Sequence, residues 1–285
     1  MSVRQACCLF SISTSVYYYN PKRKDEDSLI SEELLALIRV NNSWGFWISY
    51  HRLRNLGYQW NHKRVYRIYK ELKLNLRMKT KKRLTGRVKE PLVRPIYPNV
   101  TWSMDFMSDS LQNGRKVRTL NIIDDFNREI LEIDVAHSQP AKRVIVSLTR
   151  LIEWRGKPLE IRVDNGPEFI ATVLKDWCAN QGIELKYIQP GKPTQNSLIE
   201  RFNRTFREDV LDKFIFKKVS ELSNYGYAWM WMYNNERPHS SLNYLTPTNF
   251  LRKYGKAQQK DKNEFPTLQQ DSNNRWEHII LNVAN

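Results

Sequence analysis

The first third of the chain has the hydrophobic periodicity of helices. From Ser28 to Val40, apolar side chains recur at i, i+4, i+7 and i+8, the spacing that places them on one helix face. Gly57 is a suitable end for one later helix, and Asn61 is a suitable N-cap for the next. The helices predicted here are 28–40, 48–55 and about 62–72, and the stretch 2–19 is compatible with two shorter ones. A helix, a Gly-ended turn and a helix with a basic first turn indicate a helix-turn-helix-like DNA-binding unit, although a plain helical bundle would show the same pattern.

From residue 100 the periodicity changes to that of strands. Leu131, Ile133 and Val135 alternate with charged residues, and Asn113-Gly114 is a hairpin turn signal between two earlier strands. The predicted strands are 101–107, 117–123, 129–135, 159–163 and 184–188; the predicted helices are 140–153, 169–181, 194–211 and 220–234. Three meandering strands followed by alternating helices and strands predict an α/β fold, a mixed five-stranded sheet with flanking helices.

A basic segment separates these two parts. Residues 73–89 hold eight Lys or Arg and no acid, and three prolines follow, as in a self-repelling linker that can also lie along phosphates. The predicted divisions are a helical DNA-binding region at 1–78, a basic linker at 79–97, an α/β core at 98–251 and a polar tail at 252–285.

Composition narrows the class of protein. A hydrophobic content of 41% is enough for a core, and no uncharged apolar run is long enough to span a bilayer. The start of the chain shows no secretion signal, and three cysteines without CxxC spacing give neither a disulfide framework nor a zinc site, so we expect a reducing, cytoplasmic setting.

The charge is concentrated at one end. The net charge is +16; residues 1–98 hold 20 Lys or Arg against 7 Asp or Glu, whereas residues 99–285 hold 26 against 23. This asymmetry favours nucleic acid binding by the first part, with a merely soluble basic surface as the alternative.

Three carboxylates are candidates for chemistry. Asp105 lies inside an apolar strand, Asp164 follows the strand 159–163 directly, and Glu200 lies on the helix 194–211. A carboxylate in an apolar strand is costly unless it is paired or bound to a metal. If the two Asp-bearing strands are neighbours, the carboxylates converge, and Glu200 would complete an oxygen site for Mg²⁺ or Mn²⁺. The alternative is two surface acids and an N-cap Asp.

The helix that carries Glu200 has two distinct sides. Its apolar stripe is expected to be buried, and it comprises Ile199, Phe202, Phe206 and Val210. Its polar stripe shares the side of Glu200, and it comprises Asn196, Asn203, Arg204 and Arg207. We expect Arg207 to contact a phosphate, with an ion pair to Asp209 or Asp212 as the alternative.

Five segments carry a resemblance to a known family. They are WSMDF, IIDDFNR, RVDNGPEF, PGKPTQNSLIERFNRTFRED and YNNERPHSSLNYLTPTNF, in this order within residues 102–250. They resemble the retroviral-integrase-type core of bacterial insertion-sequence transposases, most closely the second-frame product, OrfB, of the insertion-sequence-three group. The D, D and E positions of that family fall on Asp105, Asp164 and Glu200, with 35 residues between the last two.

The resemblance implies an RNase H-like fold for the core and metal-dependent DNA cleavage and strand transfer at insertion-sequence ends. It implies two Mg²⁺ or Mn²⁺ ions held by the trio, and as partners terminal-repeat and target DNA, a first-frame OrfA product joined as a fusion, and further copies of the chain on DNA. A nuclease of the same fold, or a DNA-binding protein derived from an inactive transposase, are the rival hypotheses. The setting would be the bacterial cytoplasm, on the nucleoid.

Residues expected to contact DNA come from the helical region, the linker and the helix of Glu200. They are Lys63, Arg64, Lys81, Lys82, Arg83, Lys192, Gln195, Asn196, Arg201, Asn203, Arg204 and Arg207.

Other conspicuous residues are expected to be structural. Asp124 and Asp125 would cap a turn, Asp109 and Asp134 would lie at the surface, and Cys178 would be buried and inert. His239 and the Trp- and Tyr-rich helix 220–234 are expected to pack rather than to bind.

Overall fold

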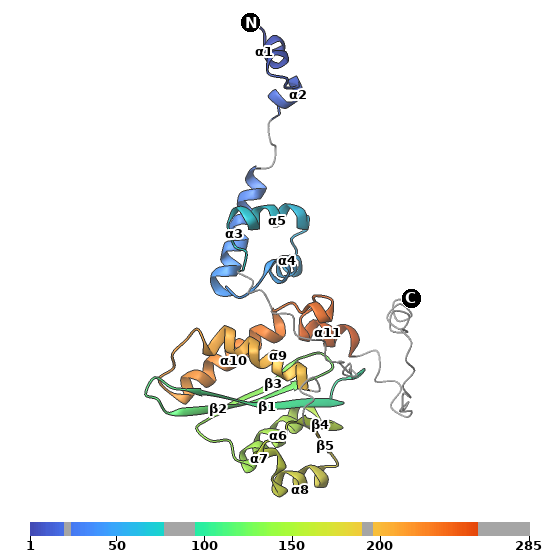
Figure 1. Ribbon diagram of the computed structural model, residues 1–285. Helices are drawn as coiled ribbons and strands as arrows, with labels where there is room; N and C mark the ends of the chain where they lie inside the picture. The colour runs from blue at the N-terminus through green and yellow to red at the C-terminus, as the bar shows by residue number, and fades with distance from the viewer. Residues whose placement is uncertain (20–23, 77–94, 190–195, 256–285) are drawn as a thin grey trace.

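The computed structural model describes residues 1–19, 24–76, 95–189 and 196–255. Figure 1 shows two short helices, a cluster of three helices and a larger α/β core in chain order. The helices before the core are α1 (Val3–Leu9), α2 (Thr14–Tyr17), α3 (Lys24–Val40), α4 (Phe46–Asn55) and α5 (His62–Glu71). The predicted helices are therefore confirmed, with earlier starts for α3 and α4.

Helices α3, α4 and α5 pack around one apolar core, and we call these three helices the helical domain. Ile30, Leu53 and Ile68, one from each helix, are buried against one another. Asn61 caps α5 as predicted, because its side chain accepts a hydrogen bond of 2.8 Å from the backbone N of Lys63.

The core is built on one five-stranded sheet in the order β3-β2-β1-β4-β5. The strands are β1 (Thr101–Ser110), β2 (Lys116–Asp124), β3 (Ile130–Ala136), β4 (Glu160–Val163) and β5 (Glu184–Tyr187). β1, β2 and β3 form an antiparallel meander, whereas β4 is parallel to β1 and β5 is parallel to β4. The predicted mixed sheet is confirmed.

Helices cover both faces of this sheet (Figure 1). One face carries α6 (Ala141–Arg155), α7 (Pro167–Ile170) and α8 (Thr172–Gln181); the other carries α9 (Ser197–Phe206), α10 (Val219–Asn235) and α11 (Pro247–Tyr254). Trp102 and Met104 of β1 belong to the apolar cluster under α6 and α8, and Met107 belongs to the cluster under α9 and α10. Because strand side chains alternate, Asp105 faces α9.

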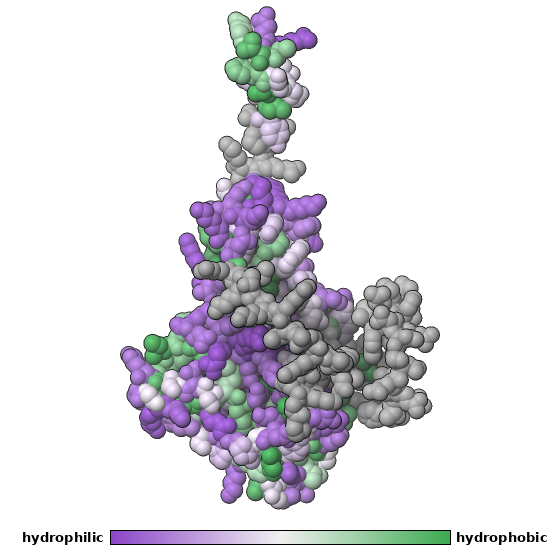
Figure 2. All heavy atoms as spheres, viewed as in Figure 1, coloured by the Kyte–Doolittle hydropathy of each residue, from purple (hydrophilic) through white to green (hydrophobic). Residues whose placement is uncertain are grey.

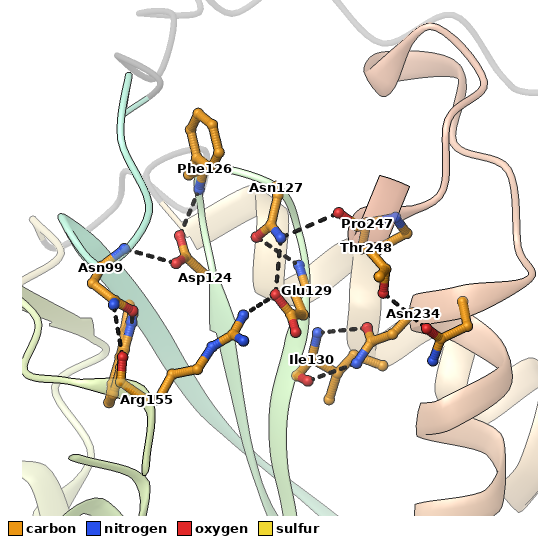
Figure 3. Close-up of polar contacts among 12 residues, drawn as sticks. Asn99, Asp124, Phe126, Asn127, Glu129, Ile130, Arg155, Asn234, Pro247 and Thr248 are labelled. Atoms are coloured by element: carbon orange, nitrogen blue, oxygen red, sulfur yellow. Dashed lines mark hydrogen bonds and ion pairs between the residues drawn. The ribbon is translucent and has the colours of Figure 1, made fainter. Parts of the chain in front are cut away.

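The turn between β2 and β3 is held by its own polar side chains (Figure 3). Asp124 accepts hydrogen bonds from the backbone N of Phe126 at 2.9 Å and of Asn99 at 2.8 Å, so its predicted capping role is confirmed. Asn127 donates to Glu129 and to the carbonyl of Pro247, the first residue of α11. These bonds fix the turn against both the sheet and the C-terminal helices.

Two predicted helices differ from the structure. The helix expected at 169–181 is divided into α7 and α8, because Ala171 has extended backbone (φ −52°, ψ 129°), and this break allows both Phe169 and Leu174 to be fully buried. The helix expected at 194–211 is α-helical only over Ser197–Phe206, and Arg207–Leu211 forms a π-helical turn. Residues 190–195 lie outside the described residues.

The C-terminal part of the core also differs from expectation. The tail was expected from Arg252, but Arg252 and Lys253 form the last turn of α11. Thr246 caps this helix by accepting a hydrogen bond from the backbone N of Asn249 at 3.2 Å. In α10, Trp229 and Tyr233 are buried as expected, whereas Trp231 is 60% exposed.

The helical domain contacts the core through α4. Arg52 pairs with Glu236 at 2.8 Å, and the ring of His51 stacks on that of Tyr244 with 3.7 Å between centroids. Figure 2 shows hydrophilic residues over α3–α5 and over the adjoining side of the core. No helix among the described residues is long and apolar enough to cross a membrane.

Candidate active site

Asp105 and Asp164 reach the same place on neighbouring strands. The parallel ladder between β1 and β4 pairs Thr101 with Glu160 and ends at Ser103 opposite Arg162. Asp105 lies two residues beyond Ser103, and Asp164 lies two residues beyond Arg162. The two carboxylates therefore occupy equivalent positions just beyond the parallel ladder of β1 and β4, Asp105 within β1 and Asp164 directly after β4, so the two strands are neighbours as the sequence hypothesis required.

Asp105 is oriented by a chain of amides from two other elements. One carboxylate oxygen accepts a hydrogen bond of 2.8 Å from the backbone N of Phe106, and the other accepts one of 2.7 Å from Nδ2 of Asn203 on α9. Asn203 in turn accepts a 2.7 Å hydrogen bond from Nδ2 of Asn121, which lies directly opposite Asp105 on β2. Both amides are buried, so this chain is shielded from solvent.

The electrostatics of Asp105 reflect its neighbours. The pKa of Asp105 is raised to about 6, first because the group is buried and further because the carboxylates of Asp164 and Glu200 repel its charge. The hydrogen bonds from Phe106 and Asn203 act in the opposite direction by stabilising the ionised form. The three predicted carboxylates are thus electrostatic neighbours.

Asp164 is held at the start of a short, anchored loop. Its Oδ1 accepts a hydrogen bond of 3.0 Å from the backbone N of Gly166. Phe169 is fully buried and stacks on Phe106 of β1, with 4.6 Å between ring centroids. Glu168 pairs with Arg118 of β2, so the loop is fixed to both central strands.

Glu200 is exposed in the first turn of α9. The predicted apolar stripe of this helix is confirmed: Ile199, Phe202, Phe206 and Val210 are all buried. Burial of Ile199 and Phe202 on either side of Glu200 fixes the rotation of α9 about its axis, so that Glu200 faces outward beside Asp105.

The three carboxylates are the type of ligand that a hard divalent cation prefers. Three carboxylates offer only oxygen ligands, and their mutual repulsion around a half-buried Asp105 is relieved when a cation binds. Within the described residues, however, no three His, Cys, Asp or Glu side chains stand together closely enough to hold a metal ion.

A second buried cluster lies behind the aspartates, and the sequence hypothesis did not include it. Asp125 accepts hydrogen bonds from Ser103 at 2.7 Å and from Arg162 at 2.7 Å. The pKa of Asp125 is raised to about 6 because the group is buried, although Arg162 opposes the shift. Asp125 therefore joins the end of β2 to β1 and β4, and the turn-capping role expected for it is not observed. Arg162, a basic residue two positions before Asp164, is the sequence signal that could have indicated this pairing.

Comparisons with known proteins show the family to which this chain is related. Residues 97–193 and 181–247 match the integrase core domain family, and residues 24–82 match the HTH-like domain family. The chain is 38% identical over 254 residues to a protein of insertion element IS407 from Burkholderia multivorans, covering 89% of this chain and 92% of that protein. The chain belongs to the integrase-core family of insertion-element transposases. This transposase is also 29% identical over 212 residues to the putative transposase InsD of insertion element IS2E from Escherichia coli K12, covering 67% of this chain and 91% of the relative.

A solved structure shows the same fold. A chain of the simian T-cell lymphotropic virus intasome aligns with a TM-score of 0.51 at 15% identity, covering 76% of this chain and 74% of that chain. The RNase H-like fold expected from the resemblance is thereby confirmed, as is the HTH-like character of the helical domain. The transposase therefore acts on DNA, as a polynucleotidyl transferase at insertion elements.

The residues expected to contact DNA are distributed unevenly in this transposase. Lys63, Arg201 and Arg204 have exposed side chains. Lys81, Lys82, Arg83, Lys192 and Gln195 lie outside the described residues. Asn196 is 3% exposed and Asn203 is 9% exposed, so both are enclosed by protein. For Asn203 the expected DNA contact is replaced by its bonds to Asp105 and Asn121.

Two expected phosphate contacts are occupied by protein groups. Arg64 pairs with Glu26 and, at 2.6 Å, with Asp27, which joins the start of α3 to α5. Arg207 donates a 2.9 Å hydrogen bond to the carbonyl of Ser108 and lies 3.7 Å from Asp109. It also lies 3.8 Å from Asp212, so the structural alternative is the one observed. Helical periodicity indicates partners on the same helix, such as Asp212, but not the contacts with Ser108 and Asp109 of β1.

Three structural expectations can also be checked. Asp134, expected at the surface, is 7% exposed and forms two hydrogen bonds of 2.6 and 2.7 Å with Arg143, because α6 covers the end of β3. Cys178 is buried as expected, and burial raises the pKa of its thiol to about 11. His239 is 7% exposed, which agrees with a packed residue.

Proposed function

We propose that Asp105, Asp164 and Glu200 are the catalytic residues of this transposase and hold two Mg²⁺ or Mn²⁺ ions. The observation that carries the proposal is the parallel register of β1 and β4, in which both aspartates lie two residues beyond the last pair. The raised pKa of Asp105, to which the other two carboxylates contribute, supports a shared site. Two such ions would activate the attacking oxygen and stabilise the leaving 3′ oxygen.

The reaction consists of two transfers at phosphorus. In the first, a water oxygen bonds to a phosphorus at the element end as the bond from phosphorus to the 3′ oxygen breaks, and that oxygen takes up a proton. In the second, the freed 3′-OH loses its proton and bonds to a phosphorus of target DNA as the bond from that phosphorus to the target strand's 3′ oxygen breaks, and that leaving oxygen takes up a proton. The protein contributes position: Asn203 directs Asp105, and the backbone N of Gly166 directs Asp164.

Cleavage of labelled element ends tests the trio. Asp105→Asn, Asp164→Asn and Glu200→Gln are each expected to abolish Mg²⁺-dependent cleavage while DNA binding persists, because each removes a ligand and leaves the basic helical domain intact. Asp176→Asn, an exposed acid on α8, is the matched control and should cleave normally. Cleavage at the wild-type rate by any trio variant would remove that residue from the site.

The rival functions differ in product. A nuclease of this fold would release cut ends without joining them, so a labelled 3′ end transferred to target DNA distinguishes a transposase from a nuclease. An inactive DNA-binding derivative would give neither product in Mg²⁺. The orientation of Asp105 by buried amides supports an intact catalytic centre.

DNA binding is divided between the two domains in this proposal. Lys63 on α5 and Arg204 on α9 are exposed, and within the described residues neither forms an ion pair, so both are available for phosphates. Residues 1–97 together are expected to bind DNA with steep salt dependence, because most of the excess positive charge lies there. Binding that stays constant from low to moderate salt would argue against this division.

We also propose that the transposase works with a first-frame OrfA product, as a fusion, and as several copies on DNA. The support is the family membership of the chain. Cleavage of element ends by the chain alone and by its fusion to the first frame tests this, and equal activity of the two would contradict it.

A further inference from the structure

A cavity of about 210 Å³ lies between α9, the turn after β2, the segment after α10 and α4 of the helical domain. Its polar lining includes Arg128 from the turn, Arg201 from α9, and Arg237 and His239 from the segment after α10. Ile48 of α4 closes one side. Arg201 follows Glu200 directly, so the cavity lies about a quarter of a turn around α9 from the carboxylates.

The charge of this cavity has one sign. Its lining includes three arginines and no Asp or Glu. Among the described residues, Arg128, Arg201 and Arg237 form no ion pair, and the acid beside Arg237 in sequence, Glu236, pairs with Arg52 instead. Asp125, which is not part of the lining, attracts Arg128 but is paired with Arg162. The three guanidinium groups around the cavity repel one another, and a bound anion would relieve this repulsion.

Three buried polar atoms at this cavity lack partners. Nε of Arg128, Nε of Arg237 and Nε2 of His239 are buried and make no hydrogen bond within the described residues. A buried polar atom without a partner is unfavourable, so two guanidinium N–H donors and an imidazole nitrogen together at one cavity indicate a ligand that satisfies them. His239 is 7% exposed and its ring packs against that of Tyr233, 4.7 Å away, so it cannot turn to solvent freely.

Two of the three arginines, Arg128 and Arg237, are held in place before any ligand binds. Arg128 has positive φ, 59°, in the turn that Asp124, Asn127 and Glu129 fix through the bonds of Figure 3. The guanidinium of Arg237 lies 5.6 Å from the ring centroid of Tyr233. Groups fixed in this way lose little entropy when an anion binds.

We propose that this cavity is a phosphate-binding pocket, separate from the carboxylate trio and formed where the helical domain meets the core. The chemistry is that of a phosphate group, which arginines bind through paired N–H donors. A phosphodiester of bound DNA is the source favoured by the proximity of Arg201 to Glu200, and that part rests on the proposed function; free phosphate is the other source. The contact of α4 at Ile48 means that an occupied pocket would join both domains to one phosphate.

Burial, together with the charges of Arg237 and Arg128, holds the pKa of His239 well below its usual range. The imidazole is therefore neutral in the empty pocket. A phosphate beside it would favour its protonation, and Nε2 would then donate to the anion.

Titration of the full chain with inorganic phosphate, followed by ³¹P line broadening at constant ionic strength, tests the pocket. The wild type is expected to bind saturably, and Arg237→Gln and Arg201→Gln are each expected to weaken binding about tenfold or more, the effect of losing one charged hydrogen bond. Arg201 is exposed, so its variant should fold even if the other does not. Arg252→Gln on α11 removes the same charge outside the pocket and should bind as the wild type does.

The source is identified with element-end duplexes in which one phosphate at a time is a neutral methylphosphonate. If DNA supplies the phosphate, a methylphosphonate at one position should weaken DNA binding by the wild type. The same substitution should not weaken DNA binding by Arg201→Gln any further. Phosphate binding without such a position would assign the pocket to free phosphate. Phosphate binding unchanged in both arginine variants would overturn the proposal. Asp105→Asn should bind phosphate normally, so failure of the trio hypothesis leaves this result unaffected.

Discussion

Asn203 on α9 donates a 2.7 Å hydrogen bond to the carboxylate of Asp105 on β1. The same amide accepts a hydrogen bond from Asn121 on β2. One side chain therefore ties β1 and β2 to α9, the helix that carries Glu200. The rotation of Asp105 and the placement of Glu200 are thereby linked.

Asn203→Ala is expected to lower Mg²⁺-dependent cleavage by about 10- to 100-fold, the usual cost of losing a residue that orients a metal ligand. The reason is that Asp105 keeps only the bond from the backbone N of Phe106. The Mg²⁺ concentration needed for half-maximal cleavage should rise, which a purely structural role would not produce. Asn180→Ala, an exposed amide on α8, is the control.

Gly166→Ala is expected to disturb Asp164 specifically. A Cβ at this position would lie 3.0 Å from Oδ1 of Asp164, closer than side-chain carbons normally approach. Cleavage should fall while the melting temperature changes little, because the backbone there (φ −63°) suits alanine. Gly45→Ala, whose Cβ would have an ordinary 3.7 Å contact with Leu76, should leave cleavage intact; equal losses in the two variants would contradict the prediction.

The raised pKa of Asp124 leads us to expect that the stability of the protein depends on pH. Burial raises the pKa of Asp124 to about 7, above the value of about 3.9 in an unfolded chain. At pH values between these two pKa values, the folded protein therefore binds one more proton at Asp124 than the unfolded chain does. The contribution of Asp124 to the free energy of unfolding falls as the pH rises through this window, by up to about 4 kcal/mol. Urea unfolding of wild type and Asp124→Asn at pH 5 and pH 8 measures it: the difference should shift in favour of the variant at pH 8. A difference that stays the same at both pH values would exclude titration of Asp124.

Lys63 and Arg64 should respond differently to the same change. Lys63→Ala is expected to weaken DNA binding and to lower the slope of log affinity against log salt by about one, because its exposed ammonium can meet one phosphate. Arg64→Ala should instead destabilise the helical domain by about 1–2 kcal/mol, since its guanidinium joins α5 to Glu26 and Asp27. The reverse pattern, with Arg64→Ala affecting only the salt slope, would contradict the structural assignment.

The placement of the three carboxylates could be predicted from the sequence, because each stands at a position that the period of its own strand or helix defines; their catalytic role stays a prediction. Asp105 interrupts an apolar strand, Asp164 follows one, and Glu200 opposes the stripe of Ile199 and Phe202. Each inference needs only the period of one strand or helix.

The partners of the polar side chains could not be predicted in this way. Asn203 and Arg207 lie on the polar side of their helix, yet both are engaged by β1, through Asp105 and Ser108. Helical periodicity gives the side of a residue but not what packs there. The grouping of Arg128 with Arg237 likewise depends on how a turn and a distant loop meet in space.

The pairing of β1 with β4 has a consequence for how the chain folds. Thr101 meets Glu160 across a loop that includes two strands and a helix, and Glu200 is farther along still. Such long-range closure is slow, whereas the contacts of α3, α4 and α5 lie within fewer than 50 residues and form early. During synthesis the N-terminal helices can be complete before β4 has left the ribosome. A nascent chain would therefore acquire its HTH-like domain first and its cleavage chemistry last.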